Sequence, residues 1–213
     1  MFVRLQSAFV ARSLASLAVP LVGLALAGCP DVENPDEGEN EEEVITRVGL
    51  TFSPIAGGEV VTAAHSDPEN DGSPVIDPIT LDNGVAYTLT IRFENELADP
   101  VEDITAEVAD EDDEHQVFIS GSGVEGPATG DSAVNVVTHT YLDTDDNGLP
   151  VGLENRIVAS AVGSGEFKVM LRHLPPEDGV ATKVAGLAEA FATEGGGIAG
   201  EADVDVTFPI TVE

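Results

Sequence analysis

Residues 85–93 are Val-Ala-Tyr-Thr-Leu-Thr-Ile-Arg-Phe, so apolar side chains recur at every second position. Successive side chains of a β-strand point to opposite faces, and a period of two is therefore typical of a half-buried strand. Residues 204–212 repeat the pattern, with Val, Phe and Ile alternating with Asp, Thr and Pro. Because proline cannot donate to a β-ladder, Pro209 predicts either an edge strand or a solvent-facing position.

Further stretches with strand character lie between Gly, Pro, Asn and Asp residues. They are residues 46–53, 58–64, 116–120, 133–142, 155–162 and 166–174. Residues 101–115 instead have apolar residues three or four positions apart, which predicts a helix, and residues 180–192 fit a short helix or a long loop. The chain therefore predicts an all-β fold, an antiparallel Ig-like β-sandwich of seven to eight strands with one or two short helices.

The chain is strongly acidic. Of its 213 residues, the first 28 contain two arginines and no acid, so the other 185 keep six basic side chains against all 40 Asp and Glu, a formal charge of −34. Nucleic acid is excluded as a partner, because its binding draws most of its affinity from Lys and Arg. Such acidity is also typical of proteins that work in strong salt. The single cysteine excludes an intramolecular disulfide.

The N-terminus predicts export. Two arginines precede an apolar run, residues 14–27, which is shorter than the roughly 20 residues that span a bilayer. The run ends in Leu26-Ala27-Gly28-Cys29, which resembles the lipobox of bacterial lipoproteins. The resemblance implies that Cys29 becomes a lipidated N-terminus that anchors the protein in a lipid bilayer. The alternative is an ordinary secretory signal in which Cys29 is incidental.

Residues 30–43 contain eight acids, two prolines and one apolar side chain, a composition that predicts a solvated tether. The predicted domains are a signal peptide over residues 1–28, a lipidated cysteine with its tether over 29–43, and one β-sandwich domain over 44–213. An acidic stretch after a lipidated cysteine resembles the signals that carry some lipoproteins to the outer face of the outer membrane. We therefore expect the bacterial cell envelope, with the protein at the periplasmic or surface face of the outer membrane.

Several short motifs accompany the lipobox and the tether. They are the strand at residues 87–95, Glu114-His115-Gln116, the Asp-rich turn at residues 141–148, Leu171-Arg172-His173 and the C-terminal residues 206–212. Together they resemble a family of small, uncharacterised bacterial lipoproteins over most of residues 45–213. Members are commonly labelled as having a type 1 periplasmic-binding fold, in which strands alternate with long helices. This chain shows no such alternation, so the β-sandwich stays our prediction.

Residues 143–154 match a calcium-loop pattern, with oxygen ligands at Asp143, Asp145, Asn147 and Glu154 around a turn at Gly148. An EF-hand would need flanking helices, whereas the preceding residues 133–142 predict a strand. Two interpretations stay open. One is calcium in a β-flanked loop, and the other is a long hairpin with solvated acids, turned by Asn147-Gly148.

A second candidate site lies at the end of the predicted helix. Glu111 and His115 are four residues apart and would share one helix face, which suits a transition ion such as zinc or copper. Further ligands would have to come from elsewhere, and His173 or His139 could supply one. Our candidate transition-metal ligands are therefore Glu111, His115 and His173. The alternative is a solvated helix end beside a hydrogen-bonded core histidine.

The sequence contains no established catalytic motif. Residues 195–200 match a dinucleotide fingerprint, but they follow no predicted strand and leave only 13 residues for a βαβ unit. We therefore predict a non-enzymatic lipoprotein that binds a metal cation. The cation would be either structural calcium or captured zinc or copper. The expected protein partner is an outer-membrane transporter. The alternative is a structural or adhesive interaction module whose acidity reflects salt. A hydrolase is the third hypothesis.

Overall fold

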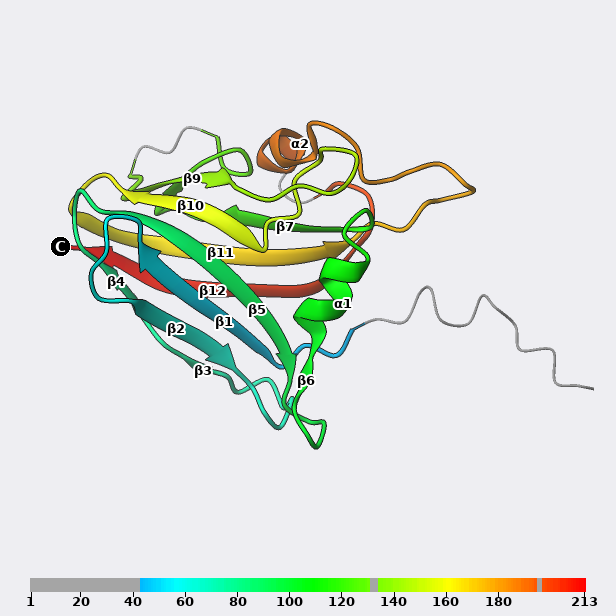
Figure 1. Cartoon of the computed structure of the whole chain (residues 1–213), viewed down its shortest axis with the longest axis horizontal. Coiled ribbons are helices and arrows are strands. Elements are labelled where there is room, and N and C mark those ends of the chain that lie inside the picture. The colour runs from blue at the N-terminus through cyan, green and yellow to red at the C-terminus, as the bar shows by residue number, and fades with distance from the viewer. Residues whose placement is uncertain (1–42, 131–133, 195–196) are drawn as a thin grey trace, which may run out of the picture. The chain divides into compact units, whose positions relative to one another are not determined.

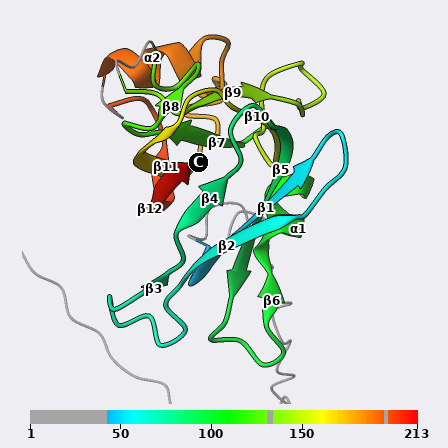
Figure 2. The same ribbon diagram turned by 90° about the vertical axis from the view of Figure 1, so that its left-hand side faces the viewer.

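The computed structural model describes residues 43–130, 134–194 and 197–213, all within one compact unit, Glu39–Glu213. These residues form two β-sheets (Figures 1 and 2) that bury a shared apolar core. The predicted β-sandwich is therefore confirmed. The lipobox, Cys29 and residues 30–42 of the predicted tether lie outside the described residues. Within the described ranges, no helix has the length and apolar character needed to cross a membrane.

The larger sheet has the strand order β3-β2-β1-β5-β10-β9-β8, with β6 paired to β5. The predicted strand at residues 85–93 forms β5 at its centre, and its apolar face is fully buried. The eight strands are β1 (Arg47–Pro54), β2 (Val61–Ser66), β3 (Val75–Ile76), β5 (Ala86–Asn95), β6 (Glu102–Asp103), β8 (Val124–Glu125), β9 (Val137–Tyr141) and β10 (Glu154–Ala159).

The smaller sheet has the order β4-β12-β11-β7. Its strands are β4 (Ile79–Leu81), β7 (His115–Ser120), β11 (Gly163–His173) and β12 (Glu201–Val212). Pro209 is exposed within β12, opposite Glu166, and β4 pairs only from Ile210 onward. The solvent-facing alternative for Pro209 therefore holds, and β12 is not an edge strand.

The expectation of a purely antiparallel sandwich is wrong, because β4 pairs with β12 and β8 with β9 in parallel. Alternation of apolar side chains shows that a segment is a strand, but it carries no information on direction. Tight hairpins force neighbouring strands to be antiparallel. No such hairpin joins β4 to β12, which lie far apart in the sequence.

The described residues also form two helices. The first, α1 (Ile104–Asp110), buries Ile104 and Val108 in the core but is shorter than predicted. Residues 110–114 are all acidic, and negative side chains are unfavourable at the negative end of the helix dipole. The chain therefore turns after Asp110 and begins β7 at His115. The second helix, α2 (Leu187–Glu194), lies over β7 (Figures 1 and 2), where Phe191 stacks on Phe118.

Candidate metal site

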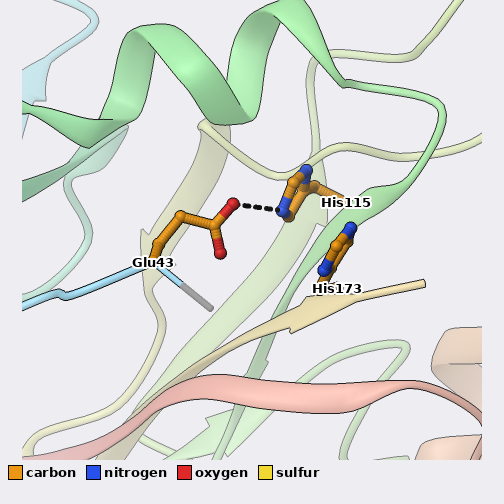
Figure 3. A group of neighbouring side chains, drawn as sticks. All are labelled: Glu43, His115 and His173. Carbon is orange, nitrogen blue, oxygen red and sulfur yellow. Dashed lines mark ion pairs between the residues drawn. The ribbon is translucent and has the colours of Figure 1, made fainter. Parts of the chain in front are cut away.

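Glu43, His115 and His173 meet where β7 begins and β11 ends (Figure 3). Each offers one ligand atom, and these atoms all lie within 4.8 Å of one another. His115 is completely buried and His173 is 7 % exposed, while the Glu43 side chain is 8 % exposed. We call these three residues the histidine cluster. It can hold a metal ion, and no other group of three or more His, Cys, Asp or Glu side chains with this property occurs among the described residues.

Strand pairing brings the two histidines together. His115 and His173 are direct partners in the antiparallel β7–β11 ladder, so their side chains lie on the same face of the sheet. Their rings stack with centroids 4.7 Å apart and an interplanar angle of 9°. Neither residue is close to the other in the sequence. The sheet therefore creates the pair of imidazoles.

Glu43 comes from the segment that leads into β1. The chain after it is fixed at Thr46, whose backbone N–H donates to Glu94 O at 3.0 Å and whose hydroxyl accepts from Glu96 N at 2.8 Å. The Glu43 carboxylate faces the two rings in Figure 3. The cluster therefore joins the lead-in to the larger sheet with two strands of the smaller sheet.

The contacts of His115 assign roles to its two ring nitrogens. Nδ1 lies 3.1 Å from the backbone carbonyl of Glu111. A carbonyl can only accept, so Nδ1 carries a proton and donates. Nε2 then faces Glu43, with its nitrogen 3.3 Å from Oε1. Metal-binding histidines usually hold their second ring nitrogen in this way, by donating to a backbone carbonyl or a carboxylate.

Charges in the cluster favour ionised Glu43 and protonated His115. Burial lowers the pKa of His115, but the Glu43 carboxylate, the Glu111 carbonyl and the charge of Asp203 together raise this pKa above its ordinary value. Burial raises the pKa of Glu43, whereas the His115 and His173 rings bring this pKa below its ordinary value. A proton and a metal ion would therefore compete for His115 Nε2.

The donor set suits zinc better than calcium. Zinc takes imidazole nitrogen and carboxylate oxygen at about 2.0–2.2 Å, which places tetrahedral ligand atoms about 3.4 Å apart. The separation of 3.3 Å between His115 Nε2 and Glu43 Oε1 already matches that spacing. Calcium takes six to eight oxygen ligands. Two imidazoles and one carboxylate do not provide them.

The structure brings together only two of the three predicted transition-metal ligands. His115 and His173 come together, whereas the Glu111 carboxylate is half exposed and its Oε2 lies 4.0 Å from His115 Nδ1, outside the cluster. Glu111 contributes its carbonyl instead. His139 lies on β9 in the other sheet, where its Nε2 is 2.9 Å from Asn155 Oδ1.

Glu43 was missed by the sequence analysis, which assigned it to the acidic tether. It is one of eight acids within residues 30–43, and no spacing relates it to either histidine. Only its position, as the last acid before a predicted strand, distinguishes it from the others. That signal is too weak to identify a ligand.

Asp143 and Asp145, the first two predicted calcium ligands, direct their carboxylates at protein groups. Asp143 accepts hydrogen bonds from the backbone N–H groups of residues 152–154 at 2.7–2.9 Å. Asp145 Oδ1 accepts from the N–H groups of Asn147 and Leu149, and its Oδ2 is 3.0 Å from Lys183 Nζ. Both side chains of this ion pair are buried.

The remaining predicted ligands, Asn147 and Glu154, belong to exposed residues. The loop connects β9 with β10, so strands flank it as expected, and Gly148 has a φ of 78° at its turn. Asp143, Asp145 and Glu154 do not form a metal-ligand group within the described part of the chain. Calcium binding by this loop stays a prediction.

Comparison of the chain with protein-family models, with curated proteins and with solved structures finds no match. The resemblance to a lipoprotein family therefore stays a prediction.

Proposed function

We propose that this protein is a non-enzymatic, membrane-anchored lipoprotein of the bacterial cell envelope that binds a transition metal ion, zinc above all, through Glu43, His115 and His173. The sequence around Cys29 supports the anchor and the export. The histidine cluster supports the metal. A metal-holding protein of this kind would work beside a transporter in the outer membrane.

One observation carries the proposal. Glu43 Oε2 is buried without a hydrogen bond to another described residue, and His115 Nε2 is buried with the Glu43 Oε1 atom of its ion pair 3.3 Å away. A buried polar atom without a partner costs about 1–3 kcal/mol, and such atoms are rare in folded proteins. A bound ion would satisfy both atoms at once. The cluster thus has the ligand types, the spacing and the unused bonding capacity of a metal site.

The surrounding charge also favours a cation. The pKa of Glu107 on α1 is raised above its ordinary value, mainly by burial. The negative charges of Glu102, Glu43 and Glu111 raise it further. Carboxylates from α1 and its flanking turns therefore share a negative potential close to Glu43. Such a potential concentrates cations and speeds their arrival at a binding site.

Burial of the ligands supports a holding role rather than catalysis. Catalytic zinc sites keep one coordination position open to water or substrate. Here both histidines and the Glu43 side chain are largely shielded from solvent, which favours retention of an ion over access for a substrate. Structural or captured metal is thus the use that best fits the cluster.

The test is metal-dependent stability of the full-length chain, purified in mild detergent without chelator. Zinc at a hundredfold excess over its Kd should raise the free energy of unfolding by about 2.7 kcal/mol, and EDTA should remove the gain. Glu43→Gln and His115→Ala should abolish the zinc effect. His65→Gln and Glu59→Gln are matched controls that remove an imidazole and an exposed carboxylate outside the cluster, and they should retain it.

Loss of the zinc effect in the control variants as well would place the ion elsewhere. No bound metal and no shift with zinc or copper would overturn the metal function. A structural or adhesive interaction module would then be the better explanation.

A further inference from the structure

The turn between α1 and β7, residues 111–114, contacts both histidines of the cluster. The Glu111 carbonyl is 3.1 Å from His115 Nδ1. At the other end of the turn, Glu114 Oε2 is 3.6 Å from His173 Nε2. Each ring therefore has one nitrogen beside an oxygen of this turn, and it is a different nitrogen in each ring.

The second nitrogen of each ring faces the centre of the cluster. Figure 3 shows one nitrogen of His115 and one of His173 turned toward Glu43, and the other turned away. For His115 the inward atom is Nε2, 3.3 Å from Glu43. For His173, Nε2 lies beside Glu114, which is not a member of the three-residue group. That arrangement leaves Nδ1 as its inward atom.

We propose that His115 binds the metal through Nε2 and His173 through Nδ1, and that Glu114 is a positioning residue that holds the His173 ring. This inference rests on the proposed metal function and names the ligand atoms of that site. In the metal-bound state Glu114 accepts a hydrogen bond from Nε2–H of His173, which fixes the tautomer with a lone pair on Nδ1; in this structure Nε2 is buried without a hydrogen bond, and Glu114 Oε2, at 3.6 Å, is its ion-pair partner. A carboxylate behind a metal-bound imidazole also raises its basicity and restricts its rotation.

The backbone keeps Glu114 in place for this role. Its carbonyl accepts a hydrogen bond from Leu174 N at 2.6 Å, directly after His173. Its own N–H donates to Glu111 O at 2.9 Å, the same carbonyl that accepts from His115. One short turn thus holds both rings at fixed positions. The distance of 3.6 Å from Glu114 to Nε2 should shorten when a metal fixes the tautomer.

The decisive experiment is long-range proton–nitrogen NMR on the ¹⁵N-labelled full-length chain in detergent micelles, before and after one equivalent of zinc. We expect His115 to keep its proton on Nδ1 and shift at Nε2, and His173 to keep its proton on Nε2 and shift at Nδ1. Zinc-induced shifts at Nε2 of both rings would overturn the inference and leave the metal function intact. Absence of zinc-induced shifts in either ring would overturn the metal function itself.

Substitution of Glu114 gives a second, independent measurement. Loss of a residue that holds a metal-bound histidine ring typically weakens metal affinity by about 10- to 100-fold, and Glu114→Ala should weaken zinc binding by that amount. Glu114→Gln keeps an acceptor oxygen and should restore part of the affinity. Asp113→Ala removes a neighbouring charge without contact to His173 and serves as the control. Equal losses in Asp113→Ala and Glu114→Ala would show a general charge effect and overturn the positioning role.

Discussion

The histidine cluster and the loop at residues 143–154 both have a plausible set of metal-binding residues, but they use their donor atoms differently. In the cluster, Glu43 Oε2 is buried without a hydrogen bond to the described residues, and the partner of His115 Nε2 is Glu43 Oε1, at 3.3 Å. In the loop, Asp143 and Asp145 accept five backbone hydrogen bonds, and Asp145 also pairs with Lys183. Both regions contain residue types that bind metals, but fewer of the donor atoms in the cluster are already hydrogen bonded.

Whether the carboxylates already accept backbone hydrogen bonds distinguishes a structural turn from a candidate metal site. A carboxylate that accepts several backbone N–H groups is already stabilised as an anion. For Asp145, burial raises the pKa, but the N–H groups of Leu149 and Asn147 and the charge of Lys183 bring this pKa below its ordinary value. A metal ion would have to replace those partners. The loop therefore uses its acids to hold its own shape, and the cluster keeps its ligands available.

The largest effect should come from breaking the buried ion pair of the loop. Lys183→Met leaves Asp145 buried without its cation and should cost about 3–5 kcal/mol of stability, measured by denaturant unfolding. The matched control is Lys168→Met, because Lys168 pairs with Asp205 at 2.9 Å while both side chains stay partly exposed. That variant should lose at most about 1 kcal/mol. Equal losses would show that the Lys183 pair does not hold the loop.

The next largest effect should be the gain in stability on zinc binding, which distinguishes the cluster from the loop. At a hundredfold excess over Kd, it should stabilise the native chain by about 2.7 kcal/mol in thermal or denaturant unfolding. Asp145→Asn, in the loop, should keep this gain although its baseline stability falls. His173→Ala, in the cluster, should lose the gain. The reverse pattern would assign the ion to the loop.

Asp143 should matter for stability without any metal. Asp143→Ala removes the acceptor of three backbone N–H groups in the loop and should cost about 2 kcal/mol in denaturant unfolding, with or without EDTA. Asp146→Ala removes an exposed neighbouring acid and should be close to neutral. A loss in Asp143→Ala that appears only with calcium present would contradict a purely structural role.

The comparison extends to a third histidine, His139, whose Nε2 is 2.9 Å from Asn155 Oδ1. Burial lowers the pKa of His139 to about 4, against a smaller opposing effect of its hydrogen bond with Asn155. The unfolded chain takes up this proton near pH 6.5, so the free energy of unfolding should fall as the pH drops from 6.5 to about 4. The slope is at most about 1.4 kcal/mol per pH unit. His139→Leu should lack this slope in pH-dependent unfolding, and an unchanged slope would contradict the assignment.

Calcium should have the smallest effect. With the loop carboxylates engaged by backbone N–H groups and Lys183, millimolar calcium should leave the melting temperature of the native chain within experimental error of its value in EDTA. A calcium-specific rise that Glu154→Ala removes would overturn this expectation. It would also establish the loop as a second metal site.

Some of the site was predictable and some was not. His115 was identified by its spacing of four residues from Glu111, and His173 was identified as a further ligand from elsewhere in the chain. The partner carboxylate was not, because Glu111 shares a helical spacing with His115 only if the helix continues to residue 115. The helix ends at Asp110, where consecutive acids oppose its dipole. Glu43 had no spacing signal at all.

The sequence by itself determined that the chain forms strands and a sandwich, because alternation of apolar side chains is a local property that survives in any strand order. It also determined the acidity and the composition of the N-terminal segment. Only the tertiary structure decided strand direction, the meeting of residues 43, 115 and 173, and which acids were already hydrogen bonded. Those features depend on contacts between distant segments, and a metal site is defined by such contacts and by the bonding capacity they leave unused.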